Sequence, residues 1–154
     1  MNRQILEMAS SLAISDFAEL HVVHAWDAIG EGIMRGGVFM SEPEERVRTS
    51  VEQIRLRHKV GLDGIMREVT GDLGRDAMEY LKPQTHLVKG GTCKEIPALA
   101  KQIGADLVVM GTVARVGIPG FLIGNTAETI LNQIDCSVLA IKPPGFVTPV
   151  TSEG

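Results

Sequence analysis

Apolar residues recur along the chain at two alternating spacings, one typical of strands and one typical of helices. Short runs rich in valine and leucine predict strands at 19–26, 85–88, 105–110 and 137–141. Apolar positions three or four residues apart predict helices at 3–13, 41–69, 92–103 and 126–133, and residues 71–82 are predicted as a short helix or a turn. Strands that alternate with helices are typical of a parallel sheet, so we predict an α/β domain. The almost continuous apolar run at 105–110 predicts a strand buried on both faces.

Polar residues and glycines indicate where several of these elements begin, bend and end. Residues 41–44 and 92–95 each place a hydroxyl three positions before a glutamate, which predicts a capping box at a helix start. Gly61 and Gly64 fall inside the long second helix and predict a kink or an early end there. The glycines at 30–37 predict a loop after the first strand.

Composition places the chain among ordinary globular proteins and excludes several classes. Its 154 residues suffice for one domain with a core, and 44% of them are hydrophobic and 22% charged. A net charge of -4 argues against sequence-independent binding of nucleic acid. Because the start of the chain has no signal-peptide pattern and no apolar run is long enough to cross a bilayer, we expect no membrane association.

Cysteine and histidine usage gives no sign of a disulfide scaffold or a metal site. The two cysteines, Cys93 and Cys136, lie far apart in sequence, which predicts reduced thiols and a cytoplasmic location. Of these, Cys136 leads into the last strand and is expected in the core. His21 and His24 share a strand but point to opposite faces, while His58 and His86 belong to other elements; we therefore expect separate surface or hydrogen-bonded histidines.

The segment with the most specific chemistry is the glycine-rich loop at 111–124. It follows the predicted strand 105–110 and leads into the predicted helix 126–133. In open α/β sheets ligands bind at the carboxyl ends of the strands, where glycines let backbone N–H groups approach phosphate oxygens. The spacing matches neither the dinucleotide fingerprint nor the Walker loop, which needs a Gly-Lys-Ser/Thr sequence.

This loop resembles the nucleotide loop of the universal stress protein family. That family's pattern is Gly, two residues, Gly, nine residues, then Gly followed by Ser or Thr. Gly111 and Gly124 match the first and last glycines at the correct distance. Ala114 stands at the second glycine, and Asn125 stands at the hydroxyl position with Thr126 next to it. The resemblance covers the chain from Asn2 to Lys142 and is strongest to the UspE type, in which two such domains usually sit in tandem.

The resemblance implies a fold, a role and a set of ligand contacts. The fold is a flavodoxin-like, adenine nucleotide alpha hydrolase-like α/β sandwich with a mostly parallel sheet, over residues 1–142, followed by a flexible tail at 143–154. The role is that of a stress-response regulator or sensor, with ATP and Mg²⁺ as the implied ligand. The implied nucleotide contacts are Ala25, Met110, Gly111, Ala114, Arg115, Gly124, Asn125 and Thr126.

Two other functions remain open beside this one. The first is a nucleotide-free interaction module that dimerises through the last strand, and the substitutions at Ala114 and Asn125 favour it. The second is a slow ATPase, although no catalytic triad or carboxylate pair is apparent, so we expect no enzyme. The partners expected from the resemblance are a second copy of the chain or another universal stress protein domain.

One departure from the family affects the sheet itself. The family opens with a central strand that ends in an acidic residue, whereas this sequence opens with the helix that should follow it. Without that strand, two strand edges are left unpaired, are forced together, or receive a strand from another chain. We therefore interpret the chain as a truncated or separately encoded second half of a tandem protein.

Overall fold

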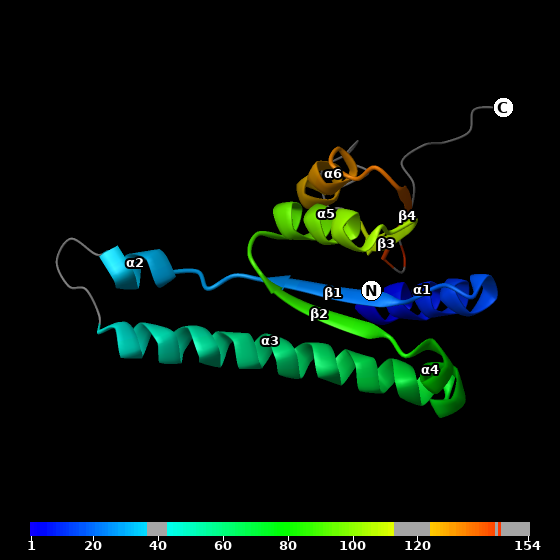
Figure 1. The fold of residues 1–154 in the computed structure, drawn as a ribbon, viewed down its shortest axis with the longest axis horizontal. Helices are drawn as coiled ribbons and strands as arrows, with labels where there is room; N and C mark the ends of the chain where they lie inside the picture. The colour runs from blue at the N-terminus through cyan, green and yellow to red at the C-terminus, as the bar shows by residue number, and fades with distance from the viewer. Residues whose placement is uncertain (37–42, 113–123, 144, 146–154) are drawn as a thin grey trace.

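The computed structural model describes residues 1–36, 43–112, 124–143 and 145, and it alternates helices with strands (Figure 1). The helices are α1 (Asn2–Asp16), α2 (Glu31–Gly36), α3 (Glu44–Leu73), α4 (Arg75–Leu81), α5 (Thr92–Ile103) and α6 (Asn125–Leu131). The strands are β1 (His21–Trp26), β2 (Gln84–Lys89), β3 (Leu107–Gly111) and β4 (Ser137–Ile141). The predicted strands are therefore confirmed to within two residues at either end.

The four strands form two parallel pairs. In the first pair, β1 runs beside β2, with His21 opposite Gln84 and Trp26 opposite Lys89. In the second pair, β3 runs beside β4, with Leu107 opposite Ser137. Within the described residues no ladder of hydrogen bonds joins the first pair to the second. The parallel arrangement is as predicted, but it is divided between two small sheets.

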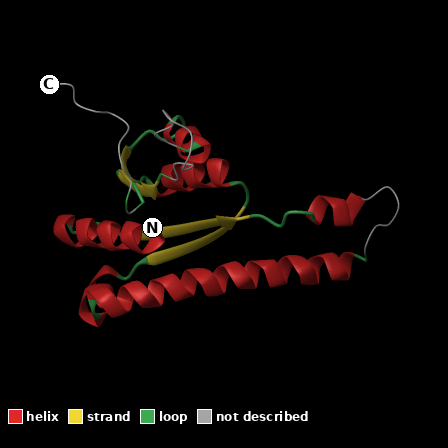
Figure 2. Cartoon of the chain, turned by 180° about the vertical axis from the view of Figure 1, so that it is seen from behind, coloured by secondary structure: helices red, strands yellow, loops and turns green. Residues whose placement is uncertain are grey.

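The main core lies around the first strand pair. Figures 1 and 2 show α3 along one side of β1 and β2, and α5 and α6 with the second strand pair on the other side. The core comes from α1, from β1 and the residue before it, and from α3 and α4; its buried members are Leu6, Ala13, Leu20, Val22, Leu62, Val69, Met78 and Leu81. Around the second pair, Ala127 and Ile130 of α6 are buried.

Two predictions about the region before and within α3 are wrong. Residues 31–36, predicted as loop, form the short helix α2, and ion pairs from Arg35 to Glu44 and from Lys89 to Glu31 connect this segment to α3 and β2. The helix α3 passes through Gly61 and Gly64 without a break. Each glycine costs about 1 kcal/mol of helix stability relative to alanine, and the buried side chains of Val47 and Val69 offset this cost.

The helix starts also differ from the predicted capping boxes. Helix α3 begins at Glu44 with Pro43 as its N-cap, and Ser41 of the first box lies outside the described residues. Helix α5 has Gly91 as its N-cap, so Thr92 is already helical and makes no side-chain cap.

The turn before α5 explains why the second box does not form. Gly90 has φ +147°, and a Cβ there would lie 2.5 Å from Oε1 of Glu95. The Glu95 side chain thus occupies the space over Gly90, where only a glycine permits both the contact and the backbone angle. At the other end of α5, the predicted C-cap at Gly104 is confirmed, in a left-handed conformation.

The prediction that the strand at 105–110 is buried on both faces is wrong. No residue of β3, all of which are described, is fully buried, and Leu107 is 41% exposed. Its neighbour β4 is likewise open, with Leu139 36% exposed, and Cys136 before it is only half-buried. The apolar run lacks burial because within the described residues β3 pairs only with β4.

Candidate functional site

A cavity of about 1210 Å³ separates the two strand pairs. Its walls come from β1 and β3, with α1 closing one side and α5 and α6 closing another. The lining is mainly apolar; representative residues are Ile5, Leu6, Val22, Leu99, Ile103 and Val109. Apolar cavities with a few polar groups at one end are the usual form of a binding site in an α/β domain.

Several residues predicted to bind nucleotide meet at the carboxyl end of this cavity. Met110 and Gly111 end β3, and Gly124, Asn125 and Thr126 begin α6; all five border the cavity. The structure therefore brings together the two ends of the glycine-rich segment.

The other predicted contacts are not placed there. Ala25 lies on β1 opposite Val88, and it is not among the residues that line the cavity, although its neighbour His24 is. Ala114 and Arg115 lie outside the described residues.

The start of α6 presents polar groups to solvent while its other face anchors the helix. Gly124 is the N-cap, and within the described residues this end has no side-chain cap; the side chains of Asn125 and Thr126 are exposed. The carbonyl of Thr126 lies 3.9 Å from Sγ of Cys93, at the start of α5. Among the described residues, the N-cap supplies no side-chain acceptor for the first N–H groups of α6, and the residues that begin this helix border the cavity.

Gly111 is confined by the first helix. A Cβ at this position would lie 3.0 Å from Cδ1 of Ile5 and 3.2 Å from Cγ of Met1. The side chains that open α1 therefore pack onto the backbone at the end of β3. This contact supplies a packing reason for glycine at the first position of the predicted loop.

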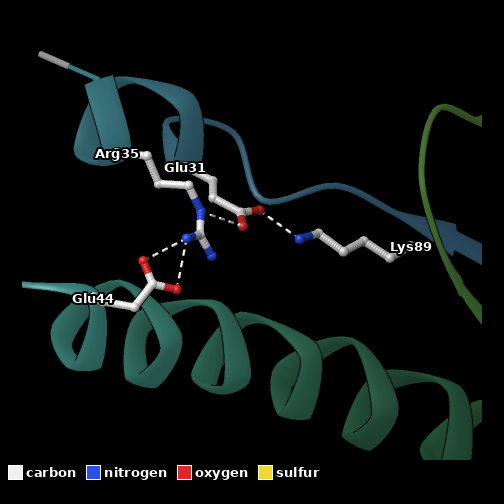
Figure 3. Close-up of polar contacts among 4 residues, drawn as sticks. All are labelled: Glu31, Arg35, Glu44 and Lys89. Atoms are coloured by element: carbon white, nitrogen blue, oxygen red, sulfur yellow. Dashed lines mark hydrogen bonds and ion pairs between the residues drawn. The ribbon is translucent and has the colours of Figure 1, made fainter.

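An ion cluster that the sequence analysis did not identify lies beyond the carboxyl end of β1 (Figure 3). Arg35 donates to Glu31 at 3.1 Å and to Oε1 of Glu44 at 2.6 Å, and Lys89 donates to the second oxygen of Glu31. These contacts join α2, the start of α3 and the end of β2. The hydrogen bond from Lys89 lowers the pKa of Glu31, which keeps this carboxylate charged.

Trp26 anchors the same end of β1. It is only 4% exposed, and its ring stacks on His58 of α3 with ring centroids 5.9 Å apart. The ammonium of Lys89 lies 6.0 Å from the Trp26 ring centroid, at the limit of a cation–π contact. One aromatic residue thus connects the first strand pair to the long helix.

The four histidines are hydrogen-bonded, one of the two expected states, and they form two pairs. Nδ1 of His21 lies 2.9 Å from Nε2 of His86, and Nε2 of His24 lies 2.8 Å from Nδ1 of His58. The different partners confirm that His21 and His24 point to opposite faces of β1. Within the described residues, no three metal-ligating side chains gather at one point, so these pairs lack the third ligand that a metal site needs.

The histidine pairs make stability sensitive to mild acid. Burial, followed by the facing ring, lowers the pKa of His24 and of His86 below the ordinary value of 6.5. Because the folded state disfavours protonation, the free energy of unfolding should be highest above pH 6.5 and should fall as the pH drops through the lowered values. Urea unfolding at about pH 7.5 and about pH 5.5 measures this fall. A double variant, His24→Gln with His86→Gln, should lose less stability over this interval, and an unchanged loss would contradict the assignment.

None of the helices in the described part of the chain combines the length and the apolar character that crossing a bilayer requires.

Comparison with protein families gives a match over nearly the whole chain. The model of the universal stress protein family matches residues 2–142. Universal stress protein E of Escherichia coli K12 is 46% identical over 66 residues, which is 43% of this chain and 21% of that protein. A homologue of universal stress protein E from Haemophilus influenzae is 29% identical over 143 residues, 92% of this chain and 42% of that protein. The chain thus spans less than half the length of these relatives.

Solved structures show the same fold. Universal stress protein UspA from Lactobacillus plantarum gives a TM-score of 0.63 at 16% identity, covering 90% of this chain and 87% of that one. A universal stress protein in complex with cAMP gives a TM-score of 0.55 at 17% identity, covering 91% of this chain and 86% of that one. A protein from Pseudomonas aeruginosa UCBPP-PA14, also described as a universal stress protein, gives a TM-score of 0.51 at 27% identity. The match covers 90% of this chain and 39% of that one. The flavodoxin-like α/β fold is therefore confirmed.

Proposed function

Because the chain belongs to the universal stress protein family, whose members have a role in the stress response, we propose that it fulfils this role as a regulatory domain that binds an adenine nucleotide. The observation that supports this most is the meeting of the end of β3 with the start of α6 at one end of a large cavity. A relative of the same fold has been solved with cAMP, which supports an adenine nucleotide as the ligand class.

Each described residue of the proposed site has a distinct task. Met110 borders the adenine with its flexible apolar side chain. Gly111 and Gly124 expose backbone to the phosphates, and Asn125 and Thr126 add exposed side-chain donors beside the first N–H groups of α6. Ala25, which does not line the cavity, is assigned to the base by resemblance alone. By resemblance alone, Ala114 and Arg115 complete the phosphate end, and Mg²⁺ accompanies ATP.

Replacing Asn125 by aspartate tests the phosphate end directly. The carboxylate would stand at the first position of α6 and repel a phosphate, so the affinity for ATP should fall about tenfold or more. The same charge is favourable at a helix N-terminus, so the variant should remain as stable as the parent. Isothermal titration calorimetry with ATP and Mg²⁺ measures the affinity, and a thermal melt measures the stability.

The matched control is Asn132→Asp, at the other end of the same helix. Asn132 is the exposed C-cap of α6, so its variant carries the same added charge far from the proposed phosphates. It should bind ATP as the parent does. Equal affinity in the parent and in Asn125→Asp, or saturable binding in none of the three, would reject the proposed site.

We propose that the role is regulatory and not catalytic, and that the protein acts in the cytoplasm with reduced thiols. Both described cysteines are free. ATP turnover that follows the pure protein through every purification step would instead favour the slow ATPase.

The second candidate function is an interaction module that dimerises through β4. Two exposed leucines favour it: Leu107 and Leu139 lie on one face of the second strand pair, 41% and 36% exposed. Within the described residues β4 pairs only with β3, so its outer edge can accept another strand. A homodimer, or a pair with a second universal stress protein domain, would cover both features.

A further inference from the structure

The first part of α3 is attached to the rest of the molecule differently from the last part. Among the described residues, the α3 members of the main core all lie at Leu62 or beyond it. Figures 1 and 2 show the start of α3, together with α2, beyond the carboxyl end of β1. Helix α2 and residues 44–60 of α3 are called the arm below.

Ion pairs join the two helices of the arm to each other and to β2. Arg35 of α2 contacts Glu44 at the start of α3, so the two helices are linked (Figure 3). Lys89 at the end of β2 contacts Glu31 of α2 and tethers the arm to the strands. Because the Lys89 side chain is 42% exposed, salt screens this tether and it holds the arm only weakly.

A histidine pair forms the closer contact between the arm and the strands. Nε2 of His24 on β1 lies 2.8 Å from Nδ1 of His58 on α3, and the His58 ring stacks on Trp26. This contact involves side chains only. The other pair, His21 with His86, bridges two strands that a ladder of six residue pairs also joins. The His24–His58 pair is therefore the one whose loss can separate two elements.

Protonation changes the His24–His58 contact from a hydrogen bond to a repulsion. In the neutral pair one ring nitrogen donates its hydrogen to the other, but when both rings are protonated two N–H donors face each other. His21 of the other pair has the carboxylate of Glu19 at 3.4 Å. Within the described residues no such contact joins His24 or His58 to a carboxylate. The charge added to this pair is thus left without a counter-ion.

The carboxylates nearest to the histidine pair along the arm are already bound to cations. Glu31 contacts Lys89 and Arg35, and Asp63 contacts Lys59. The hydrogen bond from Lys89 lowers the pKa of Glu31, so its tether persists in mild acid. The charged groups on the elements around the pair are Lys89 of β2, Glu31 and Arg35 of α2, Arg57, Lys59 and Asp63 of α3, and Glu95 of α5, whose side chain lies over Gly90.

The residues just after His58 give α3 a point at which it can bend. Gly61 and Gly64 lie inside the helix, and glycine weakens a helix relative to alanine. A Cβ at either position would meet no neighbouring group within 4 Å, so packing does not hold the backbone straight there. Hinges are a few residues that absorb changes of backbone angle, often small ones. The arm can therefore swing about these glycines while the rest of α3 stays in the core.

We propose that the arm is an acid-operated switch: protonation of the His24–His58 pair releases the arm from the end of β1, and α3 bends at Gly61 and Gly64. Burial and the facing His58 ring lower the pKa of His24 in the closed form. Opening therefore takes up protons. The closed form is most stable above pH 6.5, and opening increases as the pH falls through the lowered value.

The switch is a local change within a folded domain. It exposes Trp26, which is 4% exposed in the closed form, while the core around Leu62 and Val69 stays intact. It rests on the proposed regulatory role only for its biological meaning, which is the detection of mild acid stress. The change itself requires no nucleotide, so calorimetry with ATP and the measurements below can fail independently.

Hydrogen exchange of the full chain at about pH 7.5 and about pH 5.5, corrected for intrinsic rates, tests the proposal. Protection of residues 48–58 should fall about tenfold or more at the lower pH, whereas protection of residues 65–73 should change by less than about twofold. The fluorescence of Trp26, the single tryptophan, should shift to longer wavelength over the same interval.

Two double variants identify the pair responsible. His24→Leu with His58→Phe replaces both partners by apolar groups and keeps a ring against Trp26, so the arm should stay closed at about pH 5.5. The matched control, His21→Gln with His86→Gln, removes the other pair and should keep the acid response of residues 48–58. Circular dichroism and a thermal melt establish that both variants are folded.

Alanine substitutions test the hinge separately. Gly61→Ala with Gly64→Ala should reduce opening at about pH 5.5 by about tenfold or more, because both positions accept a Cβ and alanine stiffens the helix. The control is Gly71→Ala, which makes the same change in the core-bound part of α3, also in open space. It should open as the parent does.

Several results would overturn the proposal. An equal loss of protection in residues 48–58 and 65–73 would mean general destabilisation in place of a switch. An acid response that persists in His24→Leu with His58→Phe, or is lost in His21→Gln with His86→Gln, would remove the assigned pair. If the apolar double variant does not fold, the glycine variants decide alone: equal opening in the parent and in Gly61→Ala with Gly64→Ala would reject the hinged arm.

Discussion

Replacing Trp26 by alanine is expected to lower the free energy of unfolding by about 3–5 kcal/mol. The ring is almost fully buried at the end of β1 and stacks on His58, so its removal leaves a cavity between the first strand pair and α3. It also removes the surface beside which the ammonium of Lys89 lies. Since a domain of this size is stable by only about 5–15 kcal/mol, the loss is a large fraction of the total.

Urea unfolding followed by circular dichroism measures this effect, because Trp26 is the single tryptophan and its fluorescence disappears with it. The control is Trp26→Phe, which keeps an aromatic ring against His58 and should lose markedly less. A loss below about 1 kcal/mol for the alanine variant would mean that the end of β1 contributes little to the core.

The order of strands and helices could be predicted because it depends on short-range patterns. Each strand was apparent as a brief apolar run, and the helices followed from apolar spacing. The errors arose where distant contacts decide the outcome. Helix α2 depends on residues of other elements: Glu44 of α3 binds Arg35, and Lys89 of β2 binds Glu31. Helix α3 tolerates its glycines because the part of the helix around and after them, including Leu62 and Val69, packs in the core.

The burial of β3 also depends on distant contacts that a local sequence pattern does not reveal. An apolar run predicts that burial of a strand would be favourable, but it does not predict whether another element is present to bury it. Here the second edge of β3 faces the cavity, so Val108 and Val109 remain only half-buried. An interior-type sequence therefore coincides here with a half-exposed strand.

The candidate site was predictable only in part. The resemblance to the family's loop pattern points to Gly111, Gly124 and Asn125, and the structure places them at one end of the cavity. The histidine pairs join His21 to His86 and His24 to His58, across 65 and 34 residues of sequence, a distance at which spacing carries no information. The ion cluster around Arg35 could not be predicted either, because Glu44 and Lys89 are distant from α2 in sequence.

Replacing Leu139 by lysine is expected to weaken self-association through β4 by about a hundredfold or more, if the chain dimerises there as proposed. Leu139 lies in the middle of β4 and is 36% exposed, opposite Val109 of β3. In a two-fold dimer each copy contributes the same edge, so the substitution would bring two positive charges together and remove two apolar side chains. Sedimentation of the parent and the variant at matched concentrations measures the change.

The matched control for this substitution is Gln133→Lys, which adds the same charge at an exposed position after α6. It should associate as the parent does. The fold should survive in both variants, because a partly exposed leucine contributes less to stability than a buried one. A parent that remains monomeric would reject dimerisation through β4, and a dimer that resists Leu139→Lys would place the interface elsewhere.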